Sequence, residues 1–382
     1  MGTYKLSDLC EILDSKRKPL SALQRAKKQG IYPYYGAQGI IDHLDEYLLD
    51  GEYLLVAEDG ANLETRNQPI ANIAKGKIWV NNHAHVLGNN GKCPLNLLGF
   101  ILNNMNISPY VTGCAQPKLN QENLRNIEIE LPSHIDRIAS ILSSLDRKIE
   151  LNNKINADLE EMAQAIFKNW FVDFEPFKDG KFVDSELGMI PEGWKVISLS
   201  EIMKYNGGSQ PPASEFIDTY QEGYIRFIQI RDYDNDSHIT YIPISKRNKL
   251  CDELDIMIAR YGAALGRICW GLKGAYNVAL AKVTPIKSYY REYLRCYLNT
   301  SYFYQSINNK GARCAQSGFN QSDINSYMIA FPIDETVVMN FNDLCSSIMD
   351  KRLSLKYENS RLSLLRDTLL PRLMSGELEI PE

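Results

Sequence analysis

The stretch Cys114-Ala115-Gln116-Pro117-Lys118-Leu119-Asn120-Gln121 returns later in the chain as Cys314-Ala315-Gln316-Ser317-Gly318-Phe319-Asn320-Gln321. The identical positions are all separated by 200 residues. Leu131-Pro132 and Phe331-Pro332 close the two copies. Two copies are too few for a solenoid, so the pattern predicts a two-fold pseudo-symmetric molecule.

The starts of the two copies also match. Tyr4-Lys5-Leu6 followed by Leu9-Cys10-Glu11-Ile12 is similar to Trp194-Lys195-Val196 followed by Leu199-Ser200-Glu201-Ile202. This alignment has an offset of 190 residues and pairs Leu9 with Leu199.

We define residues 1–132 as the first repeat and residues 191–333 as the second repeat. Apolar runs bounded by glycine and charge, such as Tyr53–Ala57 and Asp255–Ala259, are typical of short buried strands. Each repeat is therefore expected to be an α+β globular unit in which strands dominate.

A long helix is expected after each repeat, over residues 133–175 and 334–376, with a linker at 176–190. In the first helix, four-three spacing predicts a coiled-coil seam. Its members are Ile138, Leu142, Leu145, Ile149, Asn152, Asn156, Leu159, Ala163, Ile166 and Trp170. In the second helix Leu355, Leu362 and Leu369 keep a seven-residue spacing. The seams favour pairing of the two helices, with the central Asn residues fixing the register. Packing of each helix on its own repeat is the alternative.

The net charge of −5 is unusual for a nucleic-acid-binding protein. The acidic excess lies outside the repeats: residues 133–190 and 334–382 together carry −7, whereas the two repeats together carry +2. The charge therefore does not exclude DNA as a partner, and it does not demonstrate one.

The cysteines and the apolar runs predict a cytoplasmic protein. The eight cysteines (Cys10, Cys93, Cys114, Cys251, Cys269, Cys296, Cys314 and Cys345) form no CxxC pair, so buried thiols are expected rather than zinc ligands or disulfides. No apolar run approaches the ~18 residues of a membrane span, and the first residues do not read as a signal peptide.

The sequence shows no recognisable catalytic constellation. It contains no GxGxxG, and Gly262 and Gly266 are not followed by the Gly-Lys-Ser/Thr of a phosphate-binding loop. Ser209-Gln210-Pro211-Pro212 lacks the Asn/Asp-Pro-Pro-aromatic order of amino-methyltransferases. His83 and His85 would share one face of a strand, but no third metal ligand has a suggestive spacing, so a structural role is favoured.

Three segments resemble Type I restriction–modification DNA-specificity subunits. Ala165–Phe174 resembles the end of their central helix, Gly188–Val196 the start of their second recognition domain, and Leu369–Leu378 their C-terminal signature. The sequence departs from the family at one feature. The family often has a Glu-Gln pair just after each recognition domain, and this chain has Ser133-His134-Ile135-Asp136 and Ile333-Asp334-Glu335 there instead.

The resemblance implies two target-recognition domains, each reading half of a bipartite, asymmetric DNA site, separated by two antiparallel coiled-coil helices. It implies a non-catalytic chain without a cofactor of its own. Two modification subunits would use S-adenosylmethionine for adenine N6 methylation, and restriction subunits would use ATP and Mg²⁺. The alternatives are a chain with its own methyltransferase or nuclease activity, and a coiled-coil scaffold that binds no DNA.

Candidate DNA-binding residues in the first repeat lie in a basic stretch and in expected loops. Lysine and arginine there suit phosphate contacts, or the stretch is a solvated basic loop, while polar side chains in loops suit base edges. The candidates are Lys16, Arg17, Lys18, Lys27, Lys28, Asn62, Arg66 and Asn82, with Arg25 and Asn81 considered beside them.

In the second repeat, Arg260 is the first choice because the buried strand before it would orient the loop in which it lies. A salt bridge from Arg260 to Asp232 or Asp255 is the alternative. The other candidates are Arg226, Gln229, Arg231, Arg267 and Arg313.

Two domains that recognise different half-sites should have different residues at the base contacts. They should share the residues that stabilise the fold or bind phosphate. Asn120 and Asn320 are shared, so we expect each to cap a short helix before the closing strand. Gln116 and Gln316 are assigned to folding or phosphate contact on the same ground.

Overall fold

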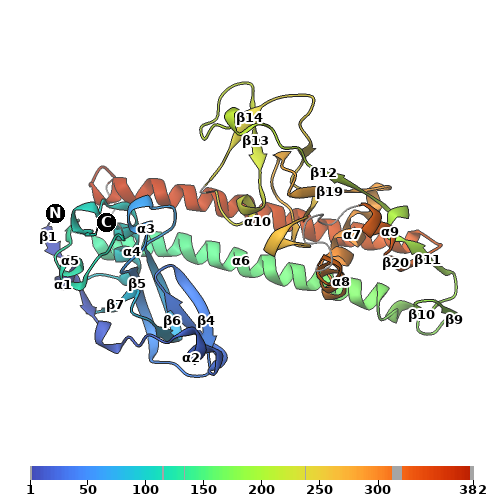
Figure 1. Ribbon diagram of the computed structural model, residues 1–382. Helices are drawn as coiled ribbons and strands as arrows, with labels where there is room; N and C mark the ends of the chain where they lie inside the picture. Colours follow the sequence, from blue (N-terminus) through green and yellow to red (C-terminus); the bar gives the residue numbers. More distant parts are fainter. Residues whose placement is uncertain (1, 114–115, 133, 237, 312–320, 379–382) are drawn as a thin grey trace. The chain divides into compact units, whose positions relative to one another are not determined.

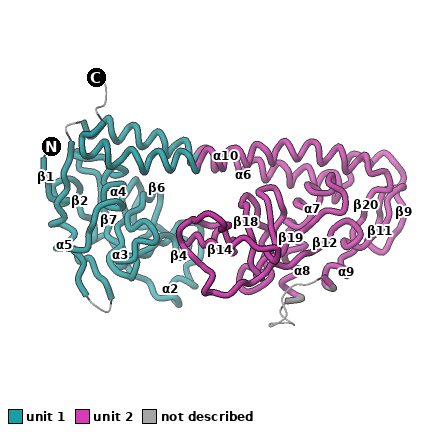
Figure 2. Tube along the Cα trace, turned by 90° about the horizontal axis from the view of Figure 1, so that it is seen from above, with its two compact units in different colours: residues 1–150, 360–382 teal, residues 151–359 magenta. Residues whose placement is uncertain are grey.

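The computed structural model describes residues 2–113, 116–132, 134–236, 238–311 and 321–378. It forms two compact units, coloured separately in Figure 2. Unit 1 contains Met1–Glu150 and Ser360–Glu382, and unit 2 contains Leu151–Asn359. Both units combine helices with sheets, which confirms the expected α+β class. Each unit also includes part of both long helices, so the units are larger than the repeats, and the exact domain limits stay predictions.

Unit 1 is built on a six-stranded sheet in the order β2-β7-β5-β6-β3-β4 (Figure 1). The strands are β2 Cys10–Ile12, β3 Gln29–Gly36, β4 Gly39–Leu44, β5 Leu49–Ala57, β6 Ala71–Val80 and β7 Ala84–Asn89. On the central strand β5, Leu54 and Val56 belong to one buried cluster and Leu55 to another. Both faces of β5 are therefore covered, which explains its unbroken apolar run.

A separate antiparallel pair, β1 (Gly2–Lys5) and β8 (Glu128–Leu131), brings the two ends of the first repeat together. The helices of the repeat are α1 Leu6–Leu9, α2 Ala22–Ala26, α3 Asn62–Thr65, α4 Leu95–Asn104 and α5 Gln121–Arg125. Asn120 caps α5 by accepting a hydrogen bond from the backbone of Asn123 at 2.8 Å, as predicted. Asn320, its expected counterpart, lies outside the described residues.

Unit 2 contains two four-stranded sheets, ordered β12-β19-β16-β17 and β14-β13-β18-β15. The strands are β12 Met203–Gly207, β13 Tyr224–Ile228, β14 Tyr241–Pro243, β15 Leu250–Cys251, β16 Ile256–Ala259, β17 Ile268–Cys269, β18 Gly274–Tyr276 and β19 Leu280–Pro285. The pair β11 (Trp194–Ser198) and β20 (Met328–Pro332) repeats the arrangement of β1 and β8. The helices of the repeat are α7 Arg291–Leu298, α8 Ser301–Gly311 and α9 Gln321–Asn325.

Hydrogen bonds at these pairs correct the alignment of the repeat starts. Leu6 N–H donates to the carbonyl of Ile127, and Leu199 N–H donates to that of Tyr327, both at 2.8 Å. Leu6, and not Leu9, is therefore the counterpart of Leu199, so the predicted alignment was wrong by three residues. The corrected register also pairs Asp8 with Glu201, and each carboxylate accepts the backbone N–H three residues before it.

The segment expected as a linker, 176–190, is folded. Most of it forms a hairpin of β9 (Phe182–Ser185) and β10 (Gly188–Pro191). The aromatic rings of Phe171, Phe174 and Phe177 surround Trp194 at centroid distances of 6.0, 5.1 and 5.3 Å. This aromatic cluster holds the hairpin region against the core, so the segment expected as a linker is part of the folded unit.

The two long helices are α6 (Ile135–Phe171) and α10 (Thr336–Met374). Within unit 2, Asn152 donates to Asn359 at 2.9 Å, and Glu160 forms an ion pair with Arg352. As the residue number increases along α6, the residue number of its contact on α10 decreases. The two helices therefore run antiparallel here. None of the predicted seam residues is exposed. The core of unit 2 contains residues from both helices and from the second repeat, so packing on the repeat also contributes.

The second repeat is attached to α10 through Trp270. The guanidinium of Arg352 lies 4.6 Å from the Trp270 ring centre, and the ammonium of Lys356 lies 5.6 Å from it. Lys356 also donates to the carbonyl of Gly271 at 3.1 Å. Strand β6 of the first repeat is continuous, but its counterpart in the second repeat is divided into β17 and β18 at this contact.

The six described cysteines are buried free thiols, as expected. Cys114 and Cys314 lie outside the described residues. No helix in the described part of the chain is long and apolar enough to cross a membrane.

Candidate nucleic-acid interface

Arg260 lies at the end of strand β16, where the backbone leaves the sheet. Its N–H donates to the carbonyl of Ala279 at 2.9 Å, and its Nη1 donates to that of Val278 at 3.3 Å. Its guanidinium lies over the rings of Tyr205 and Tyr261, at 5.8 and 5.1 Å from their centres. Arg260 also hydrogen-bonds the side chain of Tyr205, and stacking on aromatic rings is a common use of arginine.

The carboxylates proposed as salt-bridge partners of Arg260 are engaged elsewhere. Asp255 pairs with Lys282 at 2.9 Å, and Asp232 accepts the backbone N–H of Gln229 at 2.8 Å. Base reading by Arg260 stays a prediction.

The same corner exists in the first repeat, with Glu58 in the place of Arg260. Glu58 directly follows β5, and its N–H donates to the carbonyl of His83 at 2.9 Å, as that of Arg260 does to Ala279. The turn before the facing strand is also shared. Asn81 accepts the N–H of His83 at 2.8 Å, and Asn277 accepts that of Ala279 at 3.1 Å. The two repeats thus agree in backbone and differ in side chains at this corner.

Glu58 is held in a network of ion pairs. Its carboxylate lies 2.5 Å from Nη1 of Arg17 and 3.2 Å from Nζ of Lys118. Burial opposes ionisation of Glu58, but the hydrogen bond from Arg17 and nearby positive charge hold its pKa below the ordinary value. Arg17 also pairs with Asp14 at 3.3 Å, and its side chain is only 15% exposed. This network assigns Arg17 to folding rather than to the predicted phosphate contact.

His85 is held by hydrogen bonds on both ring nitrogens, and its structural role stays a prediction. Its Nδ1 lies 2.6 Å from Asp14 and its Nε2 lies 2.7 Å from the carbonyl of Leu119, and the side chain is fully buried. The structure brings Asp14 and Glu58 beside His85 as further potential metal ligands, which spacing in the sequence did not indicate, and Arg17 pairs with both carboxylates. His83 does not share a strand face with His85, because it lies in the turn before β7.

Other first-repeat candidates divide into folding residues and exposed residues. Asn62 bonds both backbone groups of Gln68, at 2.9 and 3.0 Å. Arg66, with a left-handed φ of 52°, donates to the carbonyls of Leu102, Asn103 and Met105 at the end of α4. The side chains of Asn62 and Arg66 thus hydrogen-bond the backbone of their own repeat, in contrast to the predicted contacts with base edges. Lys28 pairs with Glu46 at 2.7 Å. The exposed candidates are Lys16, Lys18, Lys27 and Asn82.

The second-repeat arginines are mostly paired. Arg226 forms an ion pair with Asp236 at 2.6 Å, and Arg267 donates two hydrogen bonds to Asp234 at 2.6 and 3.2 Å. Gln229 lies at the N-cap of a short 3-10 helix and is partly buried. Arg313 lies outside the described residues.

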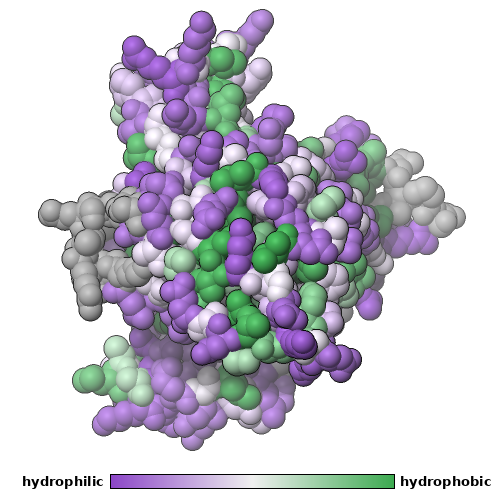
Figure 3. Space-filling model, turned by 90° about the vertical axis from the view of Figure 1, so that its right-hand side faces the viewer, coloured by the Kyte–Doolittle hydropathy of each residue, from purple (hydrophilic) through white to green (hydrophobic). Residues whose placement is uncertain are grey.

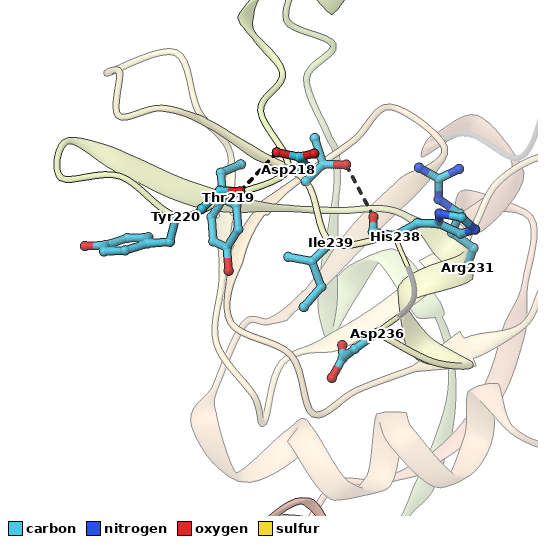
Figure 4. A pocket seen from close by; sticks show the side chains of 9 residues that line it. Asp218, Thr219, Tyr220, Arg231, Asp236, His238 and Ile239 are labelled. Atoms are coloured by element: carbon cyan, nitrogen blue, oxygen red, sulfur yellow. Dashed lines mark hydrogen bonds between the residues drawn. The ribbon is translucent and has the colours of Figure 1, made fainter. Parts of the chain in front are cut away.

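Arg231 is the most exposed described arginine among these candidates, with 55% of its side chain accessible. It lines an open cavity of about 620 Å³ together with Tyr220, Asp236 and His238 (Figure 4). This surface hollow combines a guanidinium, an imidazole and a tyrosine with the carboxylates of Asp218 and Asp236, so it presents donors and acceptors that can contact base edges.

Unit 2 also carries an apolar groove of about 800 Å³, formed by the end of α6, β10, α7 and β20. Val172, Leu187 and Met189 on its rim are 53%, 47% and 57% exposed. Figure 3 faces the end of unit 2 that carries β9 and β10, and it shows hydrophobic residues gathered among hydrophilic ones. An exposed apolar patch of this kind is typical of a protein–protein contact.

The two globular repeats, each closed by a terminal strand pair and followed by a long helix, match one known family. Its description is "Type I restriction modification DNA specificity domain", and its model matches residues 1–161 and 191–353. The chain belongs to this specificity family. The two matched regions correspond to the two repeats, each with the adjoining part of its helix.

Curated members of the specificity family align with long parts of the chain. The MjaIX specificity subunit of Methanocaldococcus jannaschii is 30% identical over 71% of this chain and 65% of its own length. The HindI specificity subunit of Haemophilus influenzae is 25% identical over 69% of this chain and 71% of its own length. A putative subunit of the same organism, S.HindORF215P, is 39% identical over 37% of this chain and 36% of its own length. The chain thus spans less than two thirds of the MjaIX and S.HindORF215P subunits.

A solved structure of the specificity family has the same fold. The Type I restriction–modification S subunit from M. genitalium covers 100% of this chain and 96% of its own, with a TM-score of 0.58 at 15% identity. This likeness establishes the fold and leaves the recognised sequence undetermined.

Sequence reasoning missed the Asp59–His83 pair, in which Asp59 lies 2.7 Å from Nδ1 of His83. An alignment of Ala57-Glu58-Asp59-Gly60 with Ala259-Arg260-Tyr261-Gly262 would have drawn attention to it, because the glycines agree and the residues between them differ.

Proposed function

We propose that the chain is the DNA-specificity subunit of a Type I restriction–modification complex, with each repeat reading one half of a bipartite, asymmetric site. The observation that carries this proposal is the corner shared by the repeats. Its backbone and its Asn turn are the same, but Glu58 stands in one repeat where Arg260 stands in the other. Two readers of different half-sites require a common fold with different side chains at the contact points.

The long helices are proposed to form an antiparallel coiled-coil scaffold that sets the distance between the half-sites. The contacts of Asn152 with Asn359 and of Glu160 with Arg352 support this role, and so does the finding that every predicted seam residue is buried or partly buried.

The chemistry is assigned to partner subunits. Two modification subunits would transfer a methyl group from S-adenosylmethionine to adenine N6, and restriction subunits would use ATP and Mg²⁺ in the cytoplasm. This chain would contribute neither a catalytic group nor a cofactor of its own. The apolar groove beside Met189 is a candidate surface for a modification subunit.

One experiment separates the proposal from its alternatives. The chain is expressed with its modification subunit in a methylation-deficient host, and the methylated positions of the genome are sequenced. We expect a single bipartite motif with an unspecified spacer. Purified chain alone, incubated with labelled S-adenosylmethionine and DNA, should transfer no methyl group. Methyl transfer by the chain alone would establish an enzyme, and an unmethylated genome combined with no gel shift by the complex would favour a scaffold.

A further inference from the structure

The corner of the first repeat presents an oriented histidine for which the second repeat has no counterpart. Asp59 lies 2.7 Å from Nδ1 of His83, and the His83 side chain is 50% exposed whereas that of Asp59 is 18% exposed. The equivalent positions in the second repeat hold Tyr261 and Ala279. The pair is therefore not required by the shared fold, because the same turn forms with alanine in the place of histidine.

The contact with Asp59 fixes which tautomer a neutral His83 adopts. An ionised Asp59 can only accept, so Nδ1 of His83 must carry the proton that lies between them. In the neutral imidazole the opposite nitrogen, Nε2, is then an acceptor. Its natural partners on DNA are the amino groups of adenine and cytosine, which are donors in the major groove.

The surroundings of His83 suit a DNA contact. Asn82 precedes it in the same turn and is exposed, and an amide side chain can bind adenine through two hydrogen bonds. Lys118 lies across the corner, where its backbone pairs with that of Asp59, and its side chain is 52% exposed. Lys118 also pairs with Glu58 at 3.2 Å, so this side of the corner is held in place while the turn with Asn82 and His83 stays exposed.

We infer that His83, positioned by Asp59, is a specificity-determining residue of the first repeat that accepts a hydrogen bond from the amino group of an adenine or cytosine. The inference rests on the proposed function and extends it to a named contact. It differs from the role of Arg260, since a guanidinium donates to guanine.

The test is the methylated motif of complexes that carry His83→Ala, which installs the residue of the second repeat. We expect one position to relax in the half-site that Arg260→Ala leaves unchanged, with affinity for the original site reduced about five- to tenfold. Asp59→Ala should relax the same position while retaining the imidazole. His43→Ala is the matched control, because His43 is an exposed histidine of the same repeat on β4, and it should leave the motif unchanged.

The outcomes are separable. An unchanged motif with His83→Ala would overturn the inference, and so would an equal loss of affinity on all DNA sequences, which indicates a phosphate contact. A wild-type complex that produces no bipartite motif would instead contradict the proposed function. Thermal unfolding of the variants should match the wild type, because His83 is half exposed and its counterpart is alanine.

Discussion

Arg17 and Arg260 donate to the carbonyls of equivalent residues in the two repeats, Asn82 at 3.4 Å and Val278 at 3.3 Å. They reach this point from different parts of the fold, since Arg17 follows a short 3-10 helix near the start of its repeat and Arg260 follows a central strand. Arg17 is neutralised by Asp14 and Glu58, whereas Arg260 stacks on tyrosines. One guanidinium is therefore held by carboxylates, and the other is held by aromatic rings.

We predict that Arg260→Ala relaxes one position of the half-site read by the second repeat. Loss of a two-bond contact to guanine should cost about 1–3 kcal/mol of binding free energy on the original site and little on other sequences. Gel shifts with single-base variants of the site measure this. Uniform weakening on all sequences would indicate a phosphate contact, and unchanged binding with lowered stability would indicate a structural role.

Gly207→Ala should reproduce part of this effect without removing the guanidinium. A Cβ at Gly207 would lie 2.8 Å from Nη1 of Arg260, so the end of that flexible side chain must move while the backbone is retained. We expect the same motif position to relax with a change in unfolding free energy of about 0.5 kcal/mol or less. The control is Ala213→Gly, an exposed position of the same repeat. Gly223→Ala does not serve as a control, because the φ of Gly223 is 85°, a conformation that disfavours alanine. A variant that folds and keeps the original motif would show that the position of the guanidinium is not critical.

The pair Asn152–Asn359 should show strong coupling in a double-mutant cycle. Asn152 is fully buried and donates to Asn359 at 2.9 Å, while its own Oδ1 has no partner among the described residues. Asn152→Leu alone should destabilise by about 1–3 kcal/mol, because the partly buried side-chain oxygens of Asn359 and Glu358 lose their donor. The double variant Asn152→Leu/Asn359→Leu should recover that loss, at the expense of a single helix register. Chemical unfolding measures the stability, and size-exclusion chromatography reports other pairings. Additive effects of the two substitutions would contradict a direct contact.

The length of the helices should set the spacer between the half-sites. Seven residues inserted after Asn156 and seven after Lys356 preserve the seam phase and add about 10 Å, or about three base pairs. Three base pairs also rotate the duplex by roughly a third of a turn, so activity should fall. Inserting twenty-one residues in each helix adds about 32 Å, close to one turn of DNA, and should restore activity with a spacer longer by about nine or ten base pairs. An unchanged spacer at full activity would show that the helices only bind partners.

Several features followed from local sequence alone. The strands β5 and β16 follow from apolar runs, the cap at Asn120 from an amide before a short helix, and both long helices from their four-three or seven-residue spacing. Local backbone preference and apolar periodicity act over a few residues, so they can be read along the chain. The internal repeat and the three segments that resemble the family also come from the sequence alone, and they predicted the family.

Only the tertiary structure decided which charged and polar residues belong to the fold. Arg17 meets Glu58 across 41 residues, and Asp59 meets His83 across 24. A basic loop residue and a buried ion-pair residue have the same local signature, so the sequence could not separate Arg17 from Lys16 and Lys18. The three-residue error in aligning the repeat starts, where Leu6 and not Leu9 matches Leu199, also arises from contacts between residues far apart in the chain. Register is set by backbone hydrogen bonds between strands far apart in the chain, and side-chain likeness alone cannot fix it.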